Sequence, residues 1–236
     1  MKRILVINPI TEDAFNAMTE EYLENFISDE IELEVISIDR GPSSIETFYD
    51  ESLALPEVLK RVRENKDKFD AIVINCFADP AVHAAREISD IPVVGPAEAS
   101  MLLALTLGRK FGVISTFRNS GPWIELQVNE LGIEDRLAEA AGIEIPVLEL
   151  GKDLDKTAQH LIEAAQKIIE EKGAEVIVLG CTGMARTAEI IRKKLNIPVV
   201  EPLAAAFKMA ELLIDLNLVH SKNGLYMKPD TGKINQ

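Results

Sequence analysis

The chain repeats itself at an offset close to half its length, and this internal repeat restricts the folds open to it more than any other feature. The segment 70–76 (DAIVINC) aligns with 175–181 (EVIVLGC), and each is an apolar run that ends in a cysteine. The segment 91–96 (IPVVGP) aligns with 197–202 (IPVVEP) at an offset of 106 residues instead of 105. Solenoid repeats are about 20 to 50 residues long, so this period predicts two homologous halves and not a solenoid.

Each half shows the same alternation of apolar strands and amphipathic helices. We expect strands at 4–7, 31–38, 70–76 and 91–94 in the first half, and at 111–114, 143–150, 175–181 and 197–200 in the second. Helical spacing predicts helices at 15–26, 55–62, 81–88, 99–107, 124–131, 161–169 and 185–195, and a last helix that ends at residue 216. This alternation is typical of the α/β class, in which helices cover both faces of parallel sheets. The sequence therefore predicts two similar α/β domains related by a pseudo-twofold axis.

The repeat also suggests where the two domains begin and end. We expect residues 1–97 and 208–236 to form the first α/β domain with a C-terminal extension, and residues 98–207 to form the second. No Gly-rich or Ser-rich linker separates the halves, and the helix expected at 99–107 spans the junction. The domains should therefore be closely packed, with the polar segment 220–236 lying on the surface or across the first half.

Charge and hydropathy exclude several classes of partner. The chain has 25 basic and 39 acidic side chains, a formal charge of −14. Nucleic acids and anionic membrane surfaces are bound by clustered Lys and Arg, so both are disfavoured as partners. The N-terminus lacks the apolar stretch of a signal peptide, and no window approaches the roughly 20 apolar residues that span a bilayer. We expect a cytoplasmic protein with a small-molecule substrate; whether it forms a homo-oligomer is left open.

The only two cysteines, Cys76 and Cys181, stand at equivalent positions of the repeat, each at the carboxyl end of an expected strand. Open parallel sheets bind ligands at that edge, and a following helix N-terminus favours a thiolate. A pseudo-twofold axis would set the two sulfurs facing each other across the interdomain cleft, which we expect to be the active site. One thiolate and one thiol there could invert a carbon acid. The alternative is that both cysteines are buried packing residues retained from a common ancestor, since free Cys is often buried.

Several motifs spread over nearly the whole chain resemble one known family. They are Ile7-Asn8-Pro9, Gly41-Pro42-Ser43-Ser44-Ile45-Glu46, Cys76-Phe77-Ala78-Asp79-Pro80, Val94-Gly95-Pro96-Ala97-Glu98-Ala99, Leu179-Gly180-Cys181-Thr182-Gly183-Met184, and Ser221-Lys222 with Tyr226 and Pro229. Together they resemble the aspartate/glutamate/hydantoin racemase superfamily, and within it the hydantoin racemases and their allantoin racemase relatives.

This resemblance implies racemisation by two cysteines without a metal or other cofactor, carried onto Cys76 and Cys181. It also implies a 5-substituted hydantoin, or a related cyclic ureide such as allantoin, bound between the domains. Removing the hydrogen at C5 of such a ring gives an enolate whose charge lands on oxygen. Preorganised hydrogen-bond donors would lower that barrier while the thiols move the protons.

Polar or aromatic residues near the strand ends are the candidates for contacting this ring. They are Asn8, Ser43, Asn75, Phe77, Thr116, Thr182 and Glu201. Each has another reading: Asn and Thr are good helix caps, Ser43 follows an ordinary Gly-Pro turn, Phe77 could pack in the core, and Glu201 could end a solvated strand.

Four residues around the expected cleft depart from the hydantoin racemase pattern: Ile10, Asn75, Ala78 and Glu201. They bear on the substrate and leave two rival functions open. An aspartate/glutamate-type amino-acid racemase needs cations for two carboxylates, and Arg118 and Arg186 are the nearest candidates. A two-domain protein that binds a small molecule without chemistry would use the cleft alone. Cis–trans isomerisation or decarboxylation on a related cysteine scaffold is a further alternative.

Overall fold

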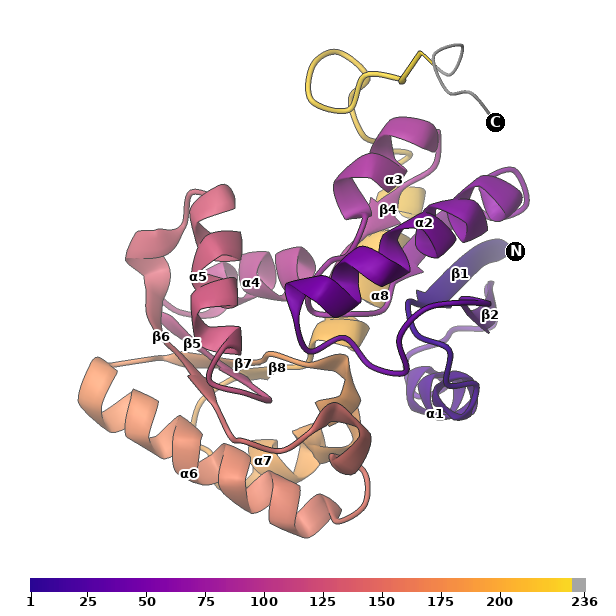
Figure 1. The fold of residues 1–236 in the computed structure, drawn as a ribbon. Helices are drawn as coiled ribbons and strands as arrows, with labels where there is room; N and C mark the ends of the chain where they lie inside the picture. Colours follow the sequence, from indigo (N-terminus) through magenta and orange to yellow (C-terminus); the bar gives the residue numbers. More distant parts are fainter. Residues whose placement is uncertain (231–236) are drawn as a thin grey trace.

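Residues 1–230 are described by a computed structural model, and they form two parallel four-stranded sheets of identical topology (Figure 1). The first sheet has the order β2-β1-β3-β4, built from Lys2–Asn8 (β1), Ile31–Ser37 (β2), Ala71–Ile74 (β3) and Val93–Val94 (β4). The second has the order β6-β5-β7-β8, built from Phe111–Ser115 (β5), Leu137–Gly142 (β6), Val176–Leu179 (β7) and Val199–Val200 (β8). The expected α/β fold of two similar domains, with parallel sheets flanked by helices, is confirmed.

Helices cover both faces of each sheet because side chains alternate along the buried strands. In β1, Ile4 and Val6 pack on one face with helices α1 (Ala14–Leu23) and α8 (Pro202–Asp215). Leu5 and Ile7 pack on the other face with α2 (Phe48–Asn65) and α3 (Val82–Ile88). The second sheet lies between α4 (Pro96–Leu107) with α5 (Ser120–Glu130) and α6 (Leu154–Lys172) with α7 (Ala188–Lys194). Short 3-10 turns lie at Glu134–Arg136 (η1), Val147–Glu149 (η2) and Thr182–Thr187 (η3). Within residues 1–230, no helix has the length and apolar character to cross a membrane.

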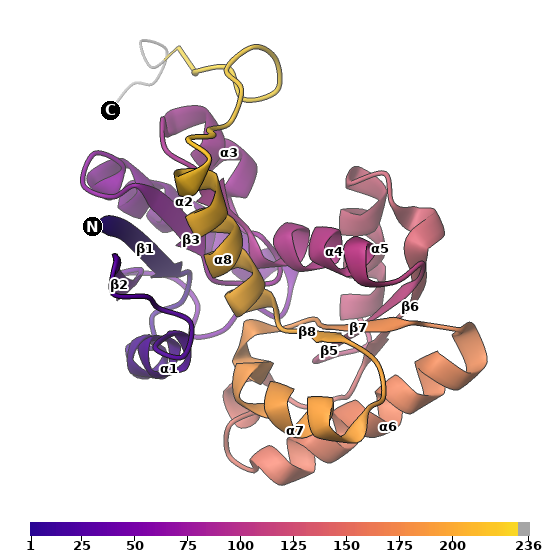
Figure 2. The same ribbon diagram turned by 180° about the vertical axis from the view of Figure 1, so that it is seen from behind.

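The last helix of each repeat packs on the sheet of the other domain. Helix α4 follows β4 of the first sheet, yet its Met101 is buried against β5 and β7 of the second. Helix α8 follows β8 of the second sheet, yet Leu203 and Phe207 are buried against β1 and β3 of the first. The two helices also pack against each other, as Figure 2 shows. This exchange ties the domains together without a linker, and it puts Leu203 and Phe207 on the first sheet although the expected boundary assigned them to the second domain.

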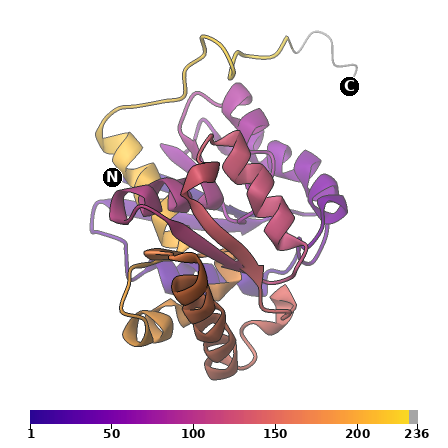
Figure 3. The ribbon, with the colours of Figure 1, turned by 90° about the vertical axis from the view of Figure 1, so that its left-hand side faces the viewer.

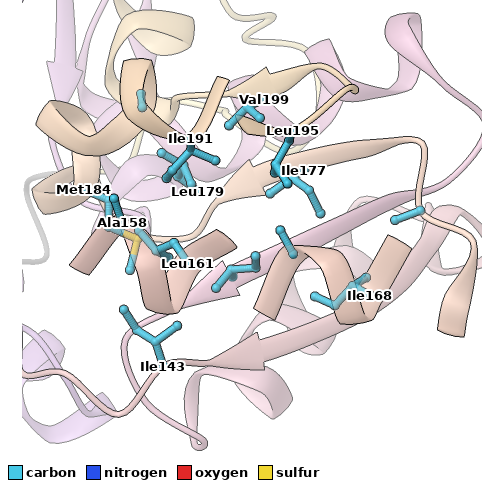
Figure 4. Close-up of a cluster of buried hydrophobic side chains, with 14 of the residues drawn as sticks. Ile143, Ala158, Leu161, Ile168, Ile177, Leu179, Met184, Ile191, Leu195 and Val199 are labelled. Carbon is cyan, nitrogen blue, oxygen red and sulfur yellow. The ribbon is translucent and has the colours of Figure 1, made fainter. Parts of the chain in front are cut away.

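The second strand of the second half lies earlier than expected. We expected a strand at 143–150, but β6 is Leu137–Gly142, an edge strand of mostly small, half-buried residues. The apolar residues that suggested the later strand are loop residues instead. Ile143 and Leu150 are buried in the core below α6, where Figure 4 shows Ile143 beside the cluster that contains Leu161 and Ile168. Burial in a loop and burial in a strand require the same apolar side chains, so the hydrophobic pattern could not separate them.

The segment after α8 packs across the first half, which is one of the two placements expected from the sequence. The amide of Val93 donates to Nε2 of His220 (2.9 Å), and the ammonium of Lys222 donates to the carbonyl of Ser89 just beyond α3 (2.6 Å). The hydroxyl of Tyr226 accepts from Arg86 Nη1 (2.9 Å). Figure 3 shows this segment at the end of the molecule opposite α6. The final residues of the predicted extension, 231–236, lie outside the described residues.

Candidate active site

The two cysteines occupy equivalent turns at the carboxyl ends of β3 and β7. The turn after Cys76 is closed by a hydrogen bond from the amide of Asp79 to the Cys76 carbonyl (3.0 Å). The matching bond in the other half runs from the amide of Met184 to the Cys181 carbonyl (3.1 Å). The repeat seen in the sequence therefore extends to the backbone geometry around each thiol.

Both thiols line one cavity between the domains. Its volume is about 750 Å³, counted out to its opening to solvent. Five of the seven candidate ligand-binding residues share it with the cysteines: Asn8, Asn75, Phe77, Thr116 and Thr182. No asparagine or threonine of this set caps a helix by its side chain. Their position at the strand ends exposes them to the cavity instead.

The structure does not bring Ser43 and Glu201 to this cavity. Ser43 is exposed, and its neighbour Ser44 lines the wall in its place. Glu201 is only 2% exposed, and its carboxylate accepts hydrogen bonds from the amides of Leu203 (2.9 Å) and Ala204 (2.7 Å). It therefore caps the N-terminus of α8, which is neither a solvated strand end nor a ligand contact.

The two halves supply this buried cap from different positions of the repeat. In the first half Asp79 accepts from the amides of Ala97 and Glu98, both 2.9 Å, at the N-terminus of α4. A Cβ atom at Gly95 would lie 2.3 Å from Cγ of Asp79, so only glycine fits there. In the second half Glu201 stands at the position of Gly95 and carries the carboxylate itself. Each helix therefore has a carboxylate that accepts hydrogen bonds from two amides at its positive end.

Burial raises the pKa of the Glu201 carboxyl to about 7, although the two amides act in the opposite direction. The unfolded chain has a carboxyl pKa near 4.3, so the stability this group contributes is present below about pH 4 and is lost as the pH rises through 7.

We expect Glu201→Gln to gain stability relative to the wild type as the pH rises from about 4 to 7, by up to about 1.4 kcal/mol per pH unit. Chemical denaturation at several pH values from 4.5 to 7.5 measures this difference in the free energy of unfolding. Glu125→Gln on the exposed face of α5 is the control, and a difference that stays constant with pH would contradict the expectation.

Burial also raises the pKa of both thiols, which corrects the expectation that helix N-termini favour thiolates. The Cys181 pKa rises to about 11, and that of Cys76 rises further, mainly because the protein packed around each partly buried cysteine disfavours the charged thiolate. The amides of Ala78 and Gly183 donate to the two sulfurs and oppose the shift, but desolvation dominates. A thiolate at Cys181 would raise the pKa of Cys76 further, and the negative charge of Glu46 adds to the rise of the Cys181 pKa. A thiolate formed here is accordingly a strong base.

Sequence reasoning did not single out three of the residues that complete the cavity: Glu46, Trp123 and Gln127. Glu46 comes from the first domain, and its carboxylate accepts from the amide of Val147 in the second (3.0 Å). The ring of Trp123 lies 4.4 Å from that of Phe48, again across the domains. For Glu46 the signal was its place just after the Gly-Pro turn at the end of β2. For Trp123 and Gln127, on the inner face of α5, no signal in the sequence pointed to a site.

The wall of the cavity carries no cation. Among the described residues that line it there is no Lys, Arg or His, and Glu46 is the one carboxylate. Arg118, a candidate for binding a carboxylate, has a side chain 93% exposed to solvent, and Arg186 lines a smaller cavity beside this one. The site is therefore suited to a neutral, polar ligand.

Comparisons with known proteins agree on one family. The family model described as Asp/Glu/Hydantoin racemase matches residues 4–210. A hydantoin racemase from Pseudomonas sp. (strain NS671) is 34% identical over 97% of this chain and 92% of its own length. One from Paenarthrobacter aurescens is 35% identical over 96% and 97%. The solved structure of the allantoin racemase from Klebsiella pneumoniae has a TM-score of 0.94 at 31% identity, covering 100% of this chain and 97% of that chain.

Proposed function

This chain belongs to the Asp/Glu/hydantoin racemase family, and we propose that it inverts the C5 centre of 5-substituted hydantoins, or of a related cyclic ureide such as allantoin, by cofactor-independent proton transfer between Cys76 and Cys181. As an isomerase of the racemase type, it needs one proton-transfer group on each face of a carbon acid. Its only two cysteines line a single cavity, one from each domain, and this observation carries the proposal.

The proposed reaction exchanges one proton at each face. The thiolate of one cysteine removes the C5 proton, so an S–H bond forms as the C–H bond breaks. The electron pair moves onto the adjacent carbonyl, which becomes an enolate. The thiol of the other cysteine then gives its proton to the opposite face of C5 and is left as the thiolate. Charge and protons balance, and the two sulfurs have exchanged roles.

Neutral hydrogen-bond donors in the cavity would stabilise the enolate. The hydroxyls of Thr116 and Thr182 make no side-chain hydrogen bond to another residue of the described chain, so both are free to donate to a ligand. Fixed donors aimed at the oxygen where charge develops are a large source of rate acceleration. They fit a reaction that passes through an enolate and needs no metal ion to hold it.

The electrostatics of the wall favour a cyclic ureide over an amino acid. A dicarboxylate would enter a cavity with no cationic residue and one carboxylate, Glu46. Transferring an unpaired charge into such a site is costly. A hydantoin ring is neutral and brings N–H donors and carbonyl acceptors, which match the amide and hydroxyl side chains that share the wall with apolar residues.

The proposal is tested by incubating optically pure 5-benzylhydantoin, allantoin, L-aspartate and L-glutamate with the purified protein in D₂O. We expect loss of optical activity for one or more of the ring substrates, with one deuterium gained at the stereocentre of the inverted product. Chiral chromatography measures the inversion, and mass spectrometry measures the deuterium gained by the same product. If an amino acid is inverted and no ring substrate is, the protein has the rival function of an amino-acid racemase. Binding of a ring with no deuterium entering it would indicate a protein that binds without chemistry.

A further inference from the structure

We propose that the side-chain oxygen of Asn75 accepts a hydrogen bond from the ring N1–H of the substrate, so that this residue selects a ureide ring and fixes which way it lies between the thiols. The inference rests on the proposed function in taking a hydantoin as the ligand. It adds a specificity-determining residue and a chemical requirement, a ring N–H beside the reacting carbon.

Asn75 offers an acceptor that the protein leaves unused. The residue is 9% exposed and lines the cavity immediately before Cys76. Its Oδ1 atom is buried and has no hydrogen-bond partner in the described chain. Buried polar atoms are nearly always paired, and an unpaired one costs stability. An unpaired acceptor in the wall of a ligand cavity is explained if the ligand supplies the donor.

A chain of amide hydrogen bonds engages the nitrogen end of the Asn75 side chain. The Asn75 Nδ2 donates to Asn8 Oδ1 (2.7 Å), and Asn8 Nδ2 in turn donates to Asn16 Oδ1 (2.7 Å). The same Asn16 oxygen accepts from the hydroxyl of Ser37 (2.9 Å). The side-chain nitrogens of Asn75 and Asn8 are therefore both engaged by other residues of the protein. The oxygen of Asn75 is what remains for the substrate.

The second half of the repeat has no counterpart to this acceptor. Gly180 precedes Cys181 as Asn75 precedes Cys76, and a Cβ atom there would lie 2.8 Å from Cβ of Ser115. Ser115 donates instead to the backbone carbonyl of Gly180 (2.8 Å). The thiols are arranged with pseudo-twofold symmetry, but the acceptor stands on the Cys76 side alone. A single orientation of an unsymmetrical ring follows.

The position of the acceptor indicates which ring atom it meets. Proton transfer requires C5 of the ring to lie between the two sulfurs. N1 is bonded directly to C5, whereas N3 is separated from C5 by the carbonyl that becomes the enolate. Asn75 and Cys76 both line the cavity, and N1 is the ring nitrogen nearer the reacting carbon, so we assign the Asn75 oxygen to N1–H. The enolate oxygen is then left to the hydroxyl donors of the wall.

The test compares two rings that differ in one atom, at a pH low enough that both are neutral, because the imide N–H of the oxygen analogue is the more acidic. A 5-benzylhydantoin has N1–H, and 5-benzyl-oxazolidine-2,4-dione has an oxygen in its place, which removes the donor and adds an acceptor facing Asn75. Loss of such a hydrogen bond leaves both polar groups unpaired, so we expect the wild type to favour the hydantoin in binding by about 10- to 100-fold. Calorimetry gives the ratio of Kd values, and racemisation gives the ratio of kcat/KM.

Asn75→Ala and Asn75→Leu remove the acceptor, and we expect both to bring the ratio for the two rings close to one. Ser37→Ala is the matched control, because it removes one hydrogen bond from the same amide chain and leaves the Asn75 oxygen in place. Its ratio should equal that of the wild type. Circular dichroism and thermal unfolding establish that each variant is folded, and Asn75→Leu fills the site with a branched, somewhat larger apolar side chain where Asn75→Ala leaves a gap.

The outcomes separate this inference from the proposed function. If the wild type racemises hydantoins but the Asn75 variants keep the wild-type ratio, the inference is overturned and the function stands. If the ratio of Kd values collapses in the Asn75 variants while no enzyme form racemises either ring, Asn75 recognises the N–H and the proposed function is wrong. Failure of the wild-type protein to bind the hydantoin more tightly than its oxygen analogue also overturns the inference.

Discussion

Cys76→Ala and Cys181→Ala are each expected to lower kcat/KM for racemisation by at least about 10³-fold, because either substitution removes the proton-transfer group on one face of the ring. The cavity and the substrate contacts of the wall remain, so ligand binding should change much less than turnover. Polarimetry on optically pure hydantoin measures the loss. Circular dichroism controls for folding, which the loss of one sulfur atom from a partly buried side chain should preserve.

Deuterium exchange separates the roles of the two thiols more sharply than the loss of rate. The Cys181→Ala enzyme keeps the thiol of Cys76, which can remove and return a proton on one face only. It should exchange the C5 hydrogen of one enantiomer for deuterium without inverting it. The Cys76→Ala enzyme should do the same for the other enantiomer. Exchange of the same enantiomer by both variants, or racemisation near the wild-type rate by either, would contradict a mechanism with one thiol on each face.

Activity should also rise steeply with pH, by about tenfold per unit between pH 7 and 10. Catalysis needs one thiolate and one thiol, and the pKa of Cys181 is raised to about 11. At pH 7 a group with that pKa is ionised in roughly one molecule in 10⁴. The fraction in the active protonation state therefore grows with pH. A falling limb is expected only at higher pH, because one thiolate makes loss of the second proton harder.

The pH dependence needs a readout that does not involve the substrate, because a hydantoin ring can itself ionise in alkali. Alkylation by iodoacetamide, followed for each cysteine by mass spectrometry, reports the thiolate fraction directly. Alkylation of Cys181 should rise over the same range as kcat/KM, ahead of Cys76. A plateau in both measurements below pH 8 would show that the thiols have low pKa values and that burial does not control them.

Much of this fold could be predicted because the information is local in the sequence. The β3 and β7 strands are short apolar runs, each followed two residues later by a cysteine, and the two copies of the pattern support each other. Seven of the eight strands lie where the alternation indicates. The exception is β6, where small half-buried residues form the strand and the larger apolar residues that follow, such as Ile143 and Leu150, belong to a loop.

The site was predicted where residues follow a strand directly. Asn8, Asn75 and Thr182 reach the cavity because the carboxyl ends of parallel strands meet at one edge of each sheet. Glu201 also follows a strand, but its two-carbon stem turns back to the amides of its own helix. Trp123 lies on a helix whose inner face is set only when α5 packs on the second sheet.

The sequence by itself determined the two homologous halves, the parallel strands and the placing of one cysteine at the same strand end in each. These follow from side-chain periodicity, which is visible within a few residues of the chain, and from the repeat, which shows the same local pattern twice. Only the tertiary structure decided that α4 and α8 exchange domains, that Glu46 and Trp123 line the same cavity as the thiols, and that both thiol pKa values rise. Desolvation and contacts across domains depend on how closely distant segments pack, and no local pattern of residues records that distance.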